Sequence, residues 1–217
     1  ELVVRKLKIV LVGDSGSGKK RCILIKFCNN EFTRQYTPTS GIDFFLKNIS
    51  VGYYKNVNLH LWDVGGLALH GNMLDKYIFG AHIILLVYDV TNSFSFEVLE
   101  EWIDKIRKLS SNYEETPLMA VVGNKCDMEH QRTVKKDRTH KFAADNGFPS
   151  HDVSARTGEA VKNSLNNEKR SFEKLSRGVS VAAQRASFEK LDASGAIAWR
   201  ASGGTNTRSR RRGGNCC

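Results

Sequence analysis

The chain has 217 residues, of which 41% are hydrophobic and 26% are charged, and its formal net charge is +10 at pH 7. This length suits one domain with a sizeable core and an appendage, and it is short for two ordinary domains. The composition is that of an ordinary globular protein, and the sequence contains no apolar run of about 18 residues, the length that a membrane-spanning helix needs.

The excess positive charge is unevenly distributed along the chain. Residues 179–217 carry seven Lys or Arg against two Asp or Glu, so half of the net charge lies in the last fifth of the sequence. We interpret this as a basic tail and not as a basic face for nucleic acid. The five cysteines are odd in number and lack metal-ligand spacing, which favours a reducing, cytosolic setting.

Short apolar runs alternate with helical patterns along the chain. The segments LKIVLVG, VNLHLWD, AHIILLVYDV and PLMAVVGNK predict strands, and residues 19–30, 94–110, 135–146 and 159–177 predict helices. Uninterrupted apolar runs such as IILLVY are typical of strands covered on both faces, hence of a mostly parallel sheet. Residues 43–63 predict instead an antiparallel hairpin with Gly52 near its turn.

These patterns predict one α/β domain over residues 1–178, followed by a different kind of segment. The end of the chain, ASGGTNTRSRRRGGNCC, is polar and rich in glycine. We expect residues 179–217 to form a flexible basic tail, because such a composition does not build a packed core.

The segment GDSGSGKK follows the first predicted strand. In open α/β sheets ligands bind at the carboxyl ends of strands, where a helix begins. A glycine-rich turn there directs backbone N–H groups inward, the helix adds its positive end, and the last lysine of the loop can reach the β- and γ-phosphates. The predicted phosphate-binding residues are Gly13, Asp14, Ser15, Gly16, Ser17, Gly18, Lys19, Lys20 and Arg21.

A second motif, WDVGG, follows another predicted strand. It places Asp63 at the strand end, where a carboxylate can accept from metal-bound water, and Gly66 three residues later, where its N–H can reach a terminal phosphate.

Two further motifs have the chemistry to recognise a base. GNKCD places Asn124, Lys125 and Asp127 after a strand. The carboxylate of Asp127 can accept from both the N1–H and the exocyclic amine of guanine, and adenine offers no such pair of donors. The backbone of Ser154, Ala155 and Arg156, after a further strand, can receive the guanine oxygen. Together with the phosphate loop, these motifs predict a binding site for a guanine nucleotide.

This ordered set of motifs, over about residues 7–177, resembles the Ras superfamily of small GTPases. The segments GIDFF, YIFGA and VYDVTNSFSF are similar to the Rab branch, and the pair Gly65–Gly66 is similar to a divergent Rab subgroup. The resemblance implies a single P-loop G domain: a mostly parallel six-stranded sheet with one antiparallel edge strand and helices on both faces.

The resemblance also implies ligands and partners. GTP or GDP would bind with Mg²⁺, Thr39 would hold the metal in the GTP state, and Asp63 would organise the metal-bound water. Residues 31–43 and 64–76 would be two switches ordered by the γ-phosphate. The implied partners are a prenylation escort, a GDP-dissociation inhibitor, an exchange factor, an activating protein and trafficking effectors, and not nucleic acid.

Lys20 departs from the family pattern, because such loops carry Ser or Thr there to give a hydroxyl oxygen to Mg²⁺. An ammonium has three donors and no acceptor. Lys20 could swing to solvent and leave the metal to water, its ammonium could partly replace the metal, or nucleotide binding could be weakened outright. We favour the first or the third outcome.

Leu67 is the second departure. It follows Gly66, at the position where the family has the glutamine that orients the attacking water. Gly66 and Leu67 occupy the two predicted catalytic positions, and only Gly66 is the residue that the family has there. Losing such a polar group costs about 10²- to 10³-fold in rate, and we expect slow hydrolysis. The alternative is that another residue or a partner positions the water.

The sequence ends in Cys216 and Cys217, which resembles the doubly prenylated end of many Rabs. Two lipid chains, or one chain and a basic patch, anchor a protein stably. Arg208, Arg210, Arg211 and Arg212 would each add about 1 kcal/mol near an anionic leaflet. We therefore expect a protein of the cytoplasm and of the cytosolic face of intracellular membranes. The alternative is an unmodified basic tail.

These features predict a Rab-like small GTPase that acts as a membrane-attached switch in vesicle trafficking, with impaired Mg²⁺ binding and slow hydrolysis. The alternative is a pseudo-GTPase that binds effectors without cycling. Lys20 and Leu67 are the residues that separate the two hypotheses.

Overall fold

The computed structural model describes residues 5–15, 20–32, 39–51, 54–113 and 116–158. A six-stranded sheet runs through this part of the chain in the order β2-β3-β1-β4-β5-β6. β2 pairs antiparallel with β3, and every other neighbouring pair is parallel. The strands are β1 Arg5–Val12, β2 Ile42–Val51, β3 Tyr54–Val64, β4 Ile83–Asp89, β5 Leu118–Asn124 and β6 Ser150–Val153. The predicted sheet, with its antiparallel edge strand, is confirmed.

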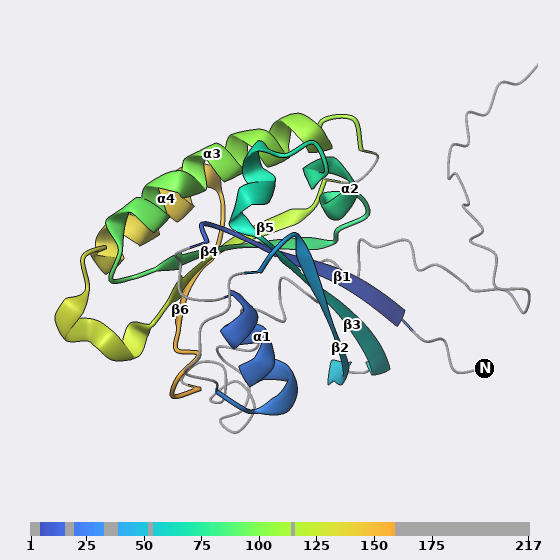
Figure 1. Ribbon diagram of the computed structural model, residues 1–217, viewed down its shortest axis with the longest axis horizontal. Helices are drawn as coiled ribbons and strands as arrows, with labels where there is room; N and C mark the ends of the chain where they lie inside the picture. The colour runs from blue at the N-terminus through green and yellow to red at the C-terminus, as the bar shows by residue number, and fades with distance from the viewer. Residues whose placement is uncertain (1–4, 16–19, 33–38, 52–53, 114–115, 159–217) are drawn as a thin grey trace, which may run out of the picture.

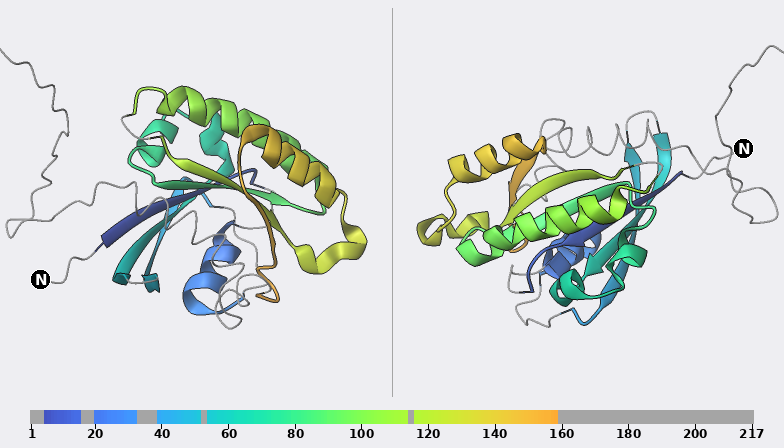
Figure 2. Two further views of the ribbon diagram at one scale, coloured as in Figure 1. Left: turned by 180° about the vertical axis from the view of Figure 1, so that it is seen from behind. Right: turned by 90° about the horizontal axis from the view of Figure 1, so that it is seen from above.

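Helices cover both faces of the sheet. Figures 1 and 2 show α1 on one face and α2, α3 and α4 on the other. The helices are α1 Lys20–Asn29, α2 Leu74–Ile78, α3 Ser93–Ser110 and α4 Lys136–Asn146, with the short 3-10 helices η1 Gly66–His70 and η2 Cys126–Gln131. The helix predicted at 159–177 and the turn predicted at Gly52 lie outside the described residues.

α2, η1 and η2 were not predicted, because five or six residues are too few to establish a helical period. Within the described ranges, the molecule has no helix with the length and apolar character needed to cross a bilayer.

β4 explains how a continuous apolar run becomes a central strand. Successive side chains of a strand point to opposite faces. Ile84, Leu86 and Tyr88 pack in the core beneath α3. Ile83 and Val87 pack in the opposite core with Leu24 of α1. Both faces are therefore buried, as the sequence IILLVY indicated.

The start of α3 shows how local sequence sets an element boundary. The Asn92 side chain accepts a hydrogen bond from the backbone N–H of Phe94 at 3.0 Å, so Asn92 caps the helix. Trp102 of this helix is fully buried in the core. The helix fixes the loop that precedes it, and that loop carries part of the site.

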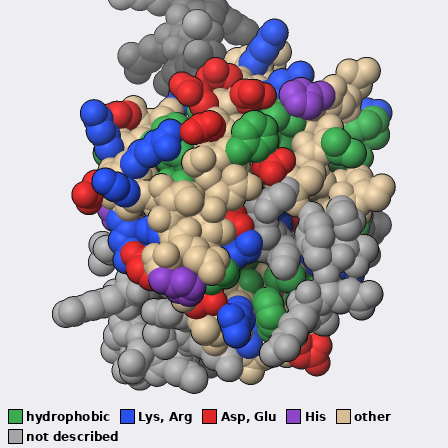
Figure 3. All heavy atoms as spheres, turned by 60° about the vertical axis from the view of Figure 1, so that its left-hand side comes forward, with side chains coloured by type: hydrophobic (Ala, Val, Ile, Leu, Met, Phe, Trp, Pro, Cys, Tyr) green, Lys and Arg blue, Asp and Glu red, His purple; other side chains and the backbone are tan. Residues whose placement is uncertain are grey.

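Charge on the face drawn in Figure 3 is mixed. Asp and Glu side chains lie interspersed with Lys and Arg side chains among the described residues of this face. The surface in this view therefore carries patches of both signs and not one basic stripe.

Candidate functional site

The loop after β1 requires glycine at its first position. Gly13 has φ +140°, and a Cβ built there would lie 2.1 Å from the Val87 carbonyl oxygen of β4. Only glycine lets the two strand ends approach this closely. Asp14 and Ser15 follow, whereas Gly16, Ser17, Gly18 and Lys19 lie outside the described residues. The structure therefore describes the predicted phosphate loop only up to Ser15 and again from Lys20.

The segment after β3 lies against this loop and against Thr39. A Cβ at Gly66 would be 2.5 Å from the Ser15 backbone nitrogen, and a Cβ at Gly65 would be 2.5 Å from the Thr39 carbonyl oxygen. The Gly65 N–H donates to the Gly41 carbonyl at 2.8 Å. Three segments that are distant in sequence thus meet through two glycines.

Asp63 lies at the centre of this meeting point and is fully buried. Its Oδ2 accepts a hydrogen bond from the Thr39 hydroxyl at 2.7 Å. Its Oδ1 is buried without a hydrogen-bond partner among the described residues. The pKa of Asp63 is raised above its ordinary value, because burial disfavours the charged carboxylate. The Lys20 charge and the Thr39 hydroxyl oppose part of this shift. The free oxygen marks a place that calls for a donor or a cation.

Lys20 turns inward at the start of α1. It is 5% exposed, and its Nζ donates to the Gly13 carbonyl at 2.7 Å. Desolvation lowers its pKa to about 8, while Asp63 and then Asp14 oppose that shift. A pKa near 8 leaves the ammonium as the main form at pH 7. The expectation that Lys20 swings to solvent is wrong, because a carbonyl and two carboxylates compensate its charge inside.

The side chains at this position do not form the magnesium site that the resemblance to the small GTPases implies. Mg²⁺ requires oxygen ligands in near-octahedral geometry. Lys20 supplies a positive charge in place of a hydroxyl oxygen, and the Thr39 hydroxyl is engaged with Asp63. Within the described ranges, no group of three or more His, Cys, Asp or Glu side chains is placed to hold a metal.

Arg21 engages β2 through its side chain. Its guanidinium forms an ion pair with the Asp43 carboxylate, and both side chains are partly exposed. The contact joins α1 to the first strand of the hairpin. The Arg21 side chain thus contacts Asp43, and the expected place of Arg21 at the nucleotide stays a prediction.

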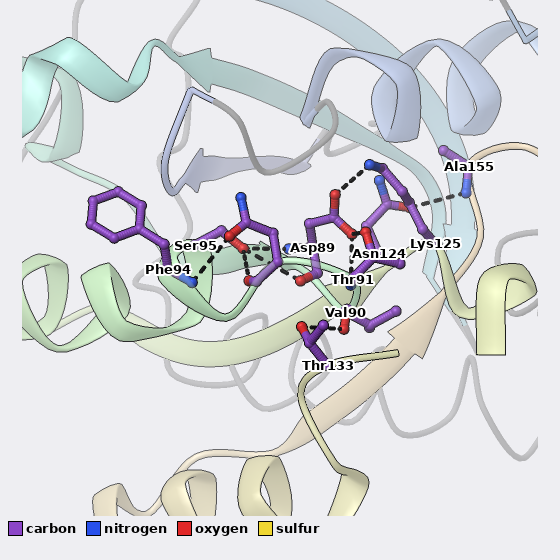
Figure 4. A network of polar contacts seen from close by, with 10 residues as sticks. Asp89, Val90, Thr91, Phe94, Ser95, Asn124, Lys125, Thr133 and Ala155 are labelled. Carbon is purple, nitrogen blue, oxygen red and sulfur yellow. Dashed lines mark hydrogen bonds and ion pairs between the residues drawn. The ribbon is translucent and has the colours of Figure 1, made fainter. Parts of the chain in front are cut away.

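A cavity of about 180 Å³ lies at the carboxyl ends of β5 and β6. Asn124 links these ends, because its Oδ1 accepts from the Ala155 N–H at 3.2 Å, as Figure 4 shows. The Asn124 carbonyl accepts from the Val90 N–H at 3.1 Å, which joins the end of β5 to the residue after β4. The cavity is lined by Phe32, Asn124, Lys125, Asp127, Met128, Ala155 and Arg156. The predicted base-recognition residues therefore come together.

Asp127 faces this cavity with a well-oriented carboxylate that is 12% exposed. Its Oδ1 accepts from the buried Ser154 hydroxyl at 2.6 Å, and the Arg156 guanidinium lies 3.9 Å from Oδ2. The Ser154 oxygen in turn accepts from the Thr157 N–H at 3.0 Å. A chain of hydrogen bonds therefore fixes the orientation of the carboxylate.

Lys125 joins the segment after β5 to the end of β4. It has φ 67°, a left-handed conformation that is rare for a lysine, and its ammonium pairs with the Asp89 carboxylate (Figure 4). Asp89 is held by the Thr91 N–H at 2.9 Å and the Thr91 hydroxyl at 2.7 Å. The left-handed backbone thus places the Lys125 ammonium in a partly buried ion pair at the end of β4.

Sequence reasoning missed Asp89 and Phe32 as site residues. Asp89 ends a predicted strand of the same parallel sheet, and that position was the available signal. Phe32 follows α1 by a few residues and carries no sequence signal, because only the tertiary fold brings it to the cavity.

Comparison with known proteins decides the family. The model of the Ras family matches residues 8–174 of this chain. The chain belongs to the Ras family. Within it the chain is a Rab-group small GTPase, and such membership implies guanine-nucleotide binding and GTPase chemistry in general.

The similar Rab proteins differ in how much of their length is matched. The chain is 40% identical over 155 residues to "Ras-related protein Rab-28" of Caenorhabditis elegans, covering 71% of this chain and 62% of that relative. It is 38% identical to "Ras-related protein Rab-10" of the same organism over 69% of this chain and 72% of that protein. It is 31% identical to "GTP-binding protein YPT1" of Saccharomyces cerevisiae over 97% of this chain and 96% of that protein.

In this Rab-group chain, Leu67 is the second residue of η1 and is 84% exposed. It has no polar side-chain atom. Gly66, by contrast, lies against Ser15 of the phosphate loop. The predicted lipidation residues Cys216 and Cys217 lie outside the described part of the chain.

Proposed function

We propose that this Rab-group chain is a guanine-nucleotide-binding switch with a weakened magnesium site and slow hydrolysis. The observation that supports it best is the cavity at the ends of β5 and β6, with Asp127 held between Ser154 and Arg156. Two carboxylate oxygens match the N1–H and exocyclic amine of guanine. Phe32 lines the same cavity and offers an aromatic face on which a base can stack.

The phosphates would extend from this cavity toward the loop after β1. Gly13, Asp14 and Ser15 begin that loop, and residues 16–19 would complete the cradle, with Lys19 at the β- and γ-phosphates. Gly66 lies close to Ser15, so its N–H would lie near the end of the proposed phosphate chain. Thr39 and Asp63 would be at the terminal phosphate in the GTP state.

Slow hydrolysis is proposed from Leu67. Its exposed side chain has no group that can orient water, and such positioning contributes about 10²- to 10³-fold. The intrinsic reaction of this class is already slow, roughly 10⁻⁴ s⁻¹ in the absence of an activating partner. Weakened magnesium binding is proposed from the inward ammonium of Lys20.

We further propose a division into a G domain at 1–178 and a basic tail at 179–217. Prenyl groups on Cys216 and Cys217 would attach the protein to the cytosolic face of intracellular membranes, with the tail arginines adding electrostatic attraction. There the two switches would recruit trafficking effectors. An exchange factor, an activating protein, a GDP-dissociation inhibitor and a prenylation escort would serve this cycle.

The second candidate function is a pseudo-GTPase that binds effectors without cycling. The inward Lys20 and the apolar Leu67 favour it, because one disturbs the usual metal site and the other removes the water-positioning group.

Two measurements on the purified full chain separate the candidates. The first is the nucleotide released on denaturation, separated by chromatography, and the second is single-turnover hydrolysis of bound GTP. Copurified guanine nucleotide with slow turnover supports the switch. An empty protein that rejects GTP and GDP at millimolar concentration eliminates it, and bound GTP without turnover supports the pseudo-GTPase.

A further inference from the structure

The position of Lys20 carries an inference that rests on the proposed nucleotide binding and goes beyond it. Its ammonium lies in the interior at the N-terminus of α1, a place where the helix dipole disfavours a cation. A buried charge persists only when it is compensated. The Gly13 carbonyl accepts a hydrogen bond from it at 2.7 Å, and Asp63 and Asp14 attract it.

The neighbouring groups form a connected polar arrangement. Asp63 is fully buried and attracted to Lys20, and the Thr39 hydroxyl donates to its Oδ2 at 2.7 Å. Thr39 is thereby held at the site by a carboxylate. A divalent cation added here would meet a lysine ammonium and would find a threonine hydroxyl already engaged.

The nucleotide phosphates, in contrast, require positive charge at this place. Gly13 and Lys20 begin and end the proposed phosphate cradle, and the Lys20 ammonium carries three N–H donors, one of which bonds the Gly13 carbonyl. An ammonium that is already buried, oriented and charged can meet an anionic oxygen without the rearrangement that binding a hydrated metal needs.

We propose that the Lys20 ammonium replaces the magnesium ion as the fixed counter-charge of the bound phosphates, so that this chain holds guanine nucleotide without a divalent metal. Asp63 and Thr39 serve in this arrangement as partners of the lysine and not as metal ligands. The nucleotide state of the protein is then insensitive to magnesium.

The test measures the dissociation of a fluorescent GDP analogue from the full chain in excess EDTA and in millimolar Mg²⁺. We expect the two rates of the natural chain to differ by less than about two-fold. Lys20→Thr, which restores a hydroxyl, should bind nucleotide tightly only with Mg²⁺ and release it at least about ten-fold faster in EDTA.

A matched control and a second readout keep the result interpretable. Lys26→Thr changes another nearly buried lysine of α1, whose Nζ bonds the Asn30 carbonyl at 3.3 Å, and it should leave the metal response unchanged. Electron paramagnetic resonance of Mn²⁺ should detect no uptake by the nucleotide-loaded natural chain, and uptake of about one ion by Lys20→Thr. Lys20→Ser replaces Lys20→Thr if the latter does not fold.

The outcomes separate the inference from the proposed function. Nucleotide that binds the natural chain and is released rapidly by EDTA, or Mn²⁺ bound beside it, overturns the inference and leaves the guanine-nucleotide proposal intact. A natural chain that binds no guanine nucleotide in either condition overturns both.

Discussion

Asp127 lines the cavity with a carboxylate whose orientation depends on Ser154, and this arrangement makes the choice of base a property of one residue. A carboxylate accepts two hydrogen bonds in a plane but donates none. Guanine presents two donors on the matching edge. Xanthine presents a carbonyl oxygen in place of the exocyclic amine, so it needs one donor and one acceptor.

Asp127→Asn should therefore change the base preference. We expect GDP affinity to fall by about 10- to 100-fold, since hydrogen bonds to charged groups contribute about 1.5–3 kcal/mol, and affinity for xanthosine diphosphate to rise. Competition against a fluorescent GDP analogue measures both. Asp145→Asn, an exposed carboxylate on α4, is the control and should change neither affinity. Equal loss for both nucleotides would contradict base recognition by Asp127.

Leu67 offers the corresponding test for hydrolysis. Because its side chain is 84% exposed, Leu67→Gln removes little packing and should change stability by less than about 0.5 kcal/mol. A glutamine amide can orient water, so we expect single-turnover hydrolysis to rise by about 10²-fold.

The matched control for this substitution is Leu46→Gln, another exposed leucine, on β2. It should leave the rate unchanged. An unchanged rate in Leu67→Gln would mean that the attacking water is positioned elsewhere or that the site does not hydrolyse GTP.

At the scale of elements, the contact between the end of β3 and residues 39–41 depends on Gly65. Its φ of −58° and ψ of 145° are accessible to alanine, so the backbone itself does not require glycine. The lack of space requires glycine, because a Cβ at this position would lie 2.5 Å from the Thr39 carbonyl oxygen and 3.1 Å from the Gly41 carbonyl oxygen. The glycine thus permits the approach that brings Thr39 to Asp63.

Gly65→Ala should displace residues 39–41 while leaving the fold intact. The gain of about 0.4–1 kcal/mol from a less flexible unfolded chain offsets part of the clash. We expect faster amide hydrogen exchange in peptides that cover 39–43 and 64–66. Gly71→Ala is the control, since a Cβ there would lie 3.5 Å from its nearest neighbouring atom, which is an ordinary contact. Unaltered exchange in Gly65→Ala would show that the contact is not tight in solution.

The helices and strands also show how much of the fold could be predicted from the sequence. β4 was predictable from its uninterrupted apolar run, because both of its faces are buried, and the long α3 was predictable from the helical period of its buried face. The motif residues at strand ends were predictable because parallel strands end at one edge. α2 was too short to give a period.

Lys20 shows why the rest of the site was not predictable. The direction of its side chain depends on a carbonyl seven positions earlier and on Asp63, forty-three positions later, and the sequence does not state the spatial arrangement of these groups. Phe32 joins the cavity only through the fold of α1 against the sheet. Tertiary contacts therefore determine where both side chains lie.

At the scale of the whole molecule, charge and lipidation act together. The net charge is +10, half of it in residues 179–217, while the face in Figure 3 carries mixed charge. The charge per residue is therefore higher in the proposed tail than in the rest of the chain, and we expect the tail to contribute most to attraction by an anionic leaflet. Each arginine near such a surface contributes about 1 kcal/mol, which screening by salt reduces.

The proposed anchor predicts graded membrane attachment in cells. One lipid chain gives only marginal, reversible binding, and two give stable anchoring. Replacing either Cys216 or Cys217 by serine should therefore shift part of the protein to the cytosolic fraction, and replacing both should shift nearly all of it. Cys28→Ser, at a half-buried cysteine of α1, controls for loss of a thiol and should leave fractionation unchanged. If the double variant stays on membranes after a high-salt wash, prenyl groups and arginines are both excluded as the anchor, because the wash screens the charge and the substitution removes the lipid.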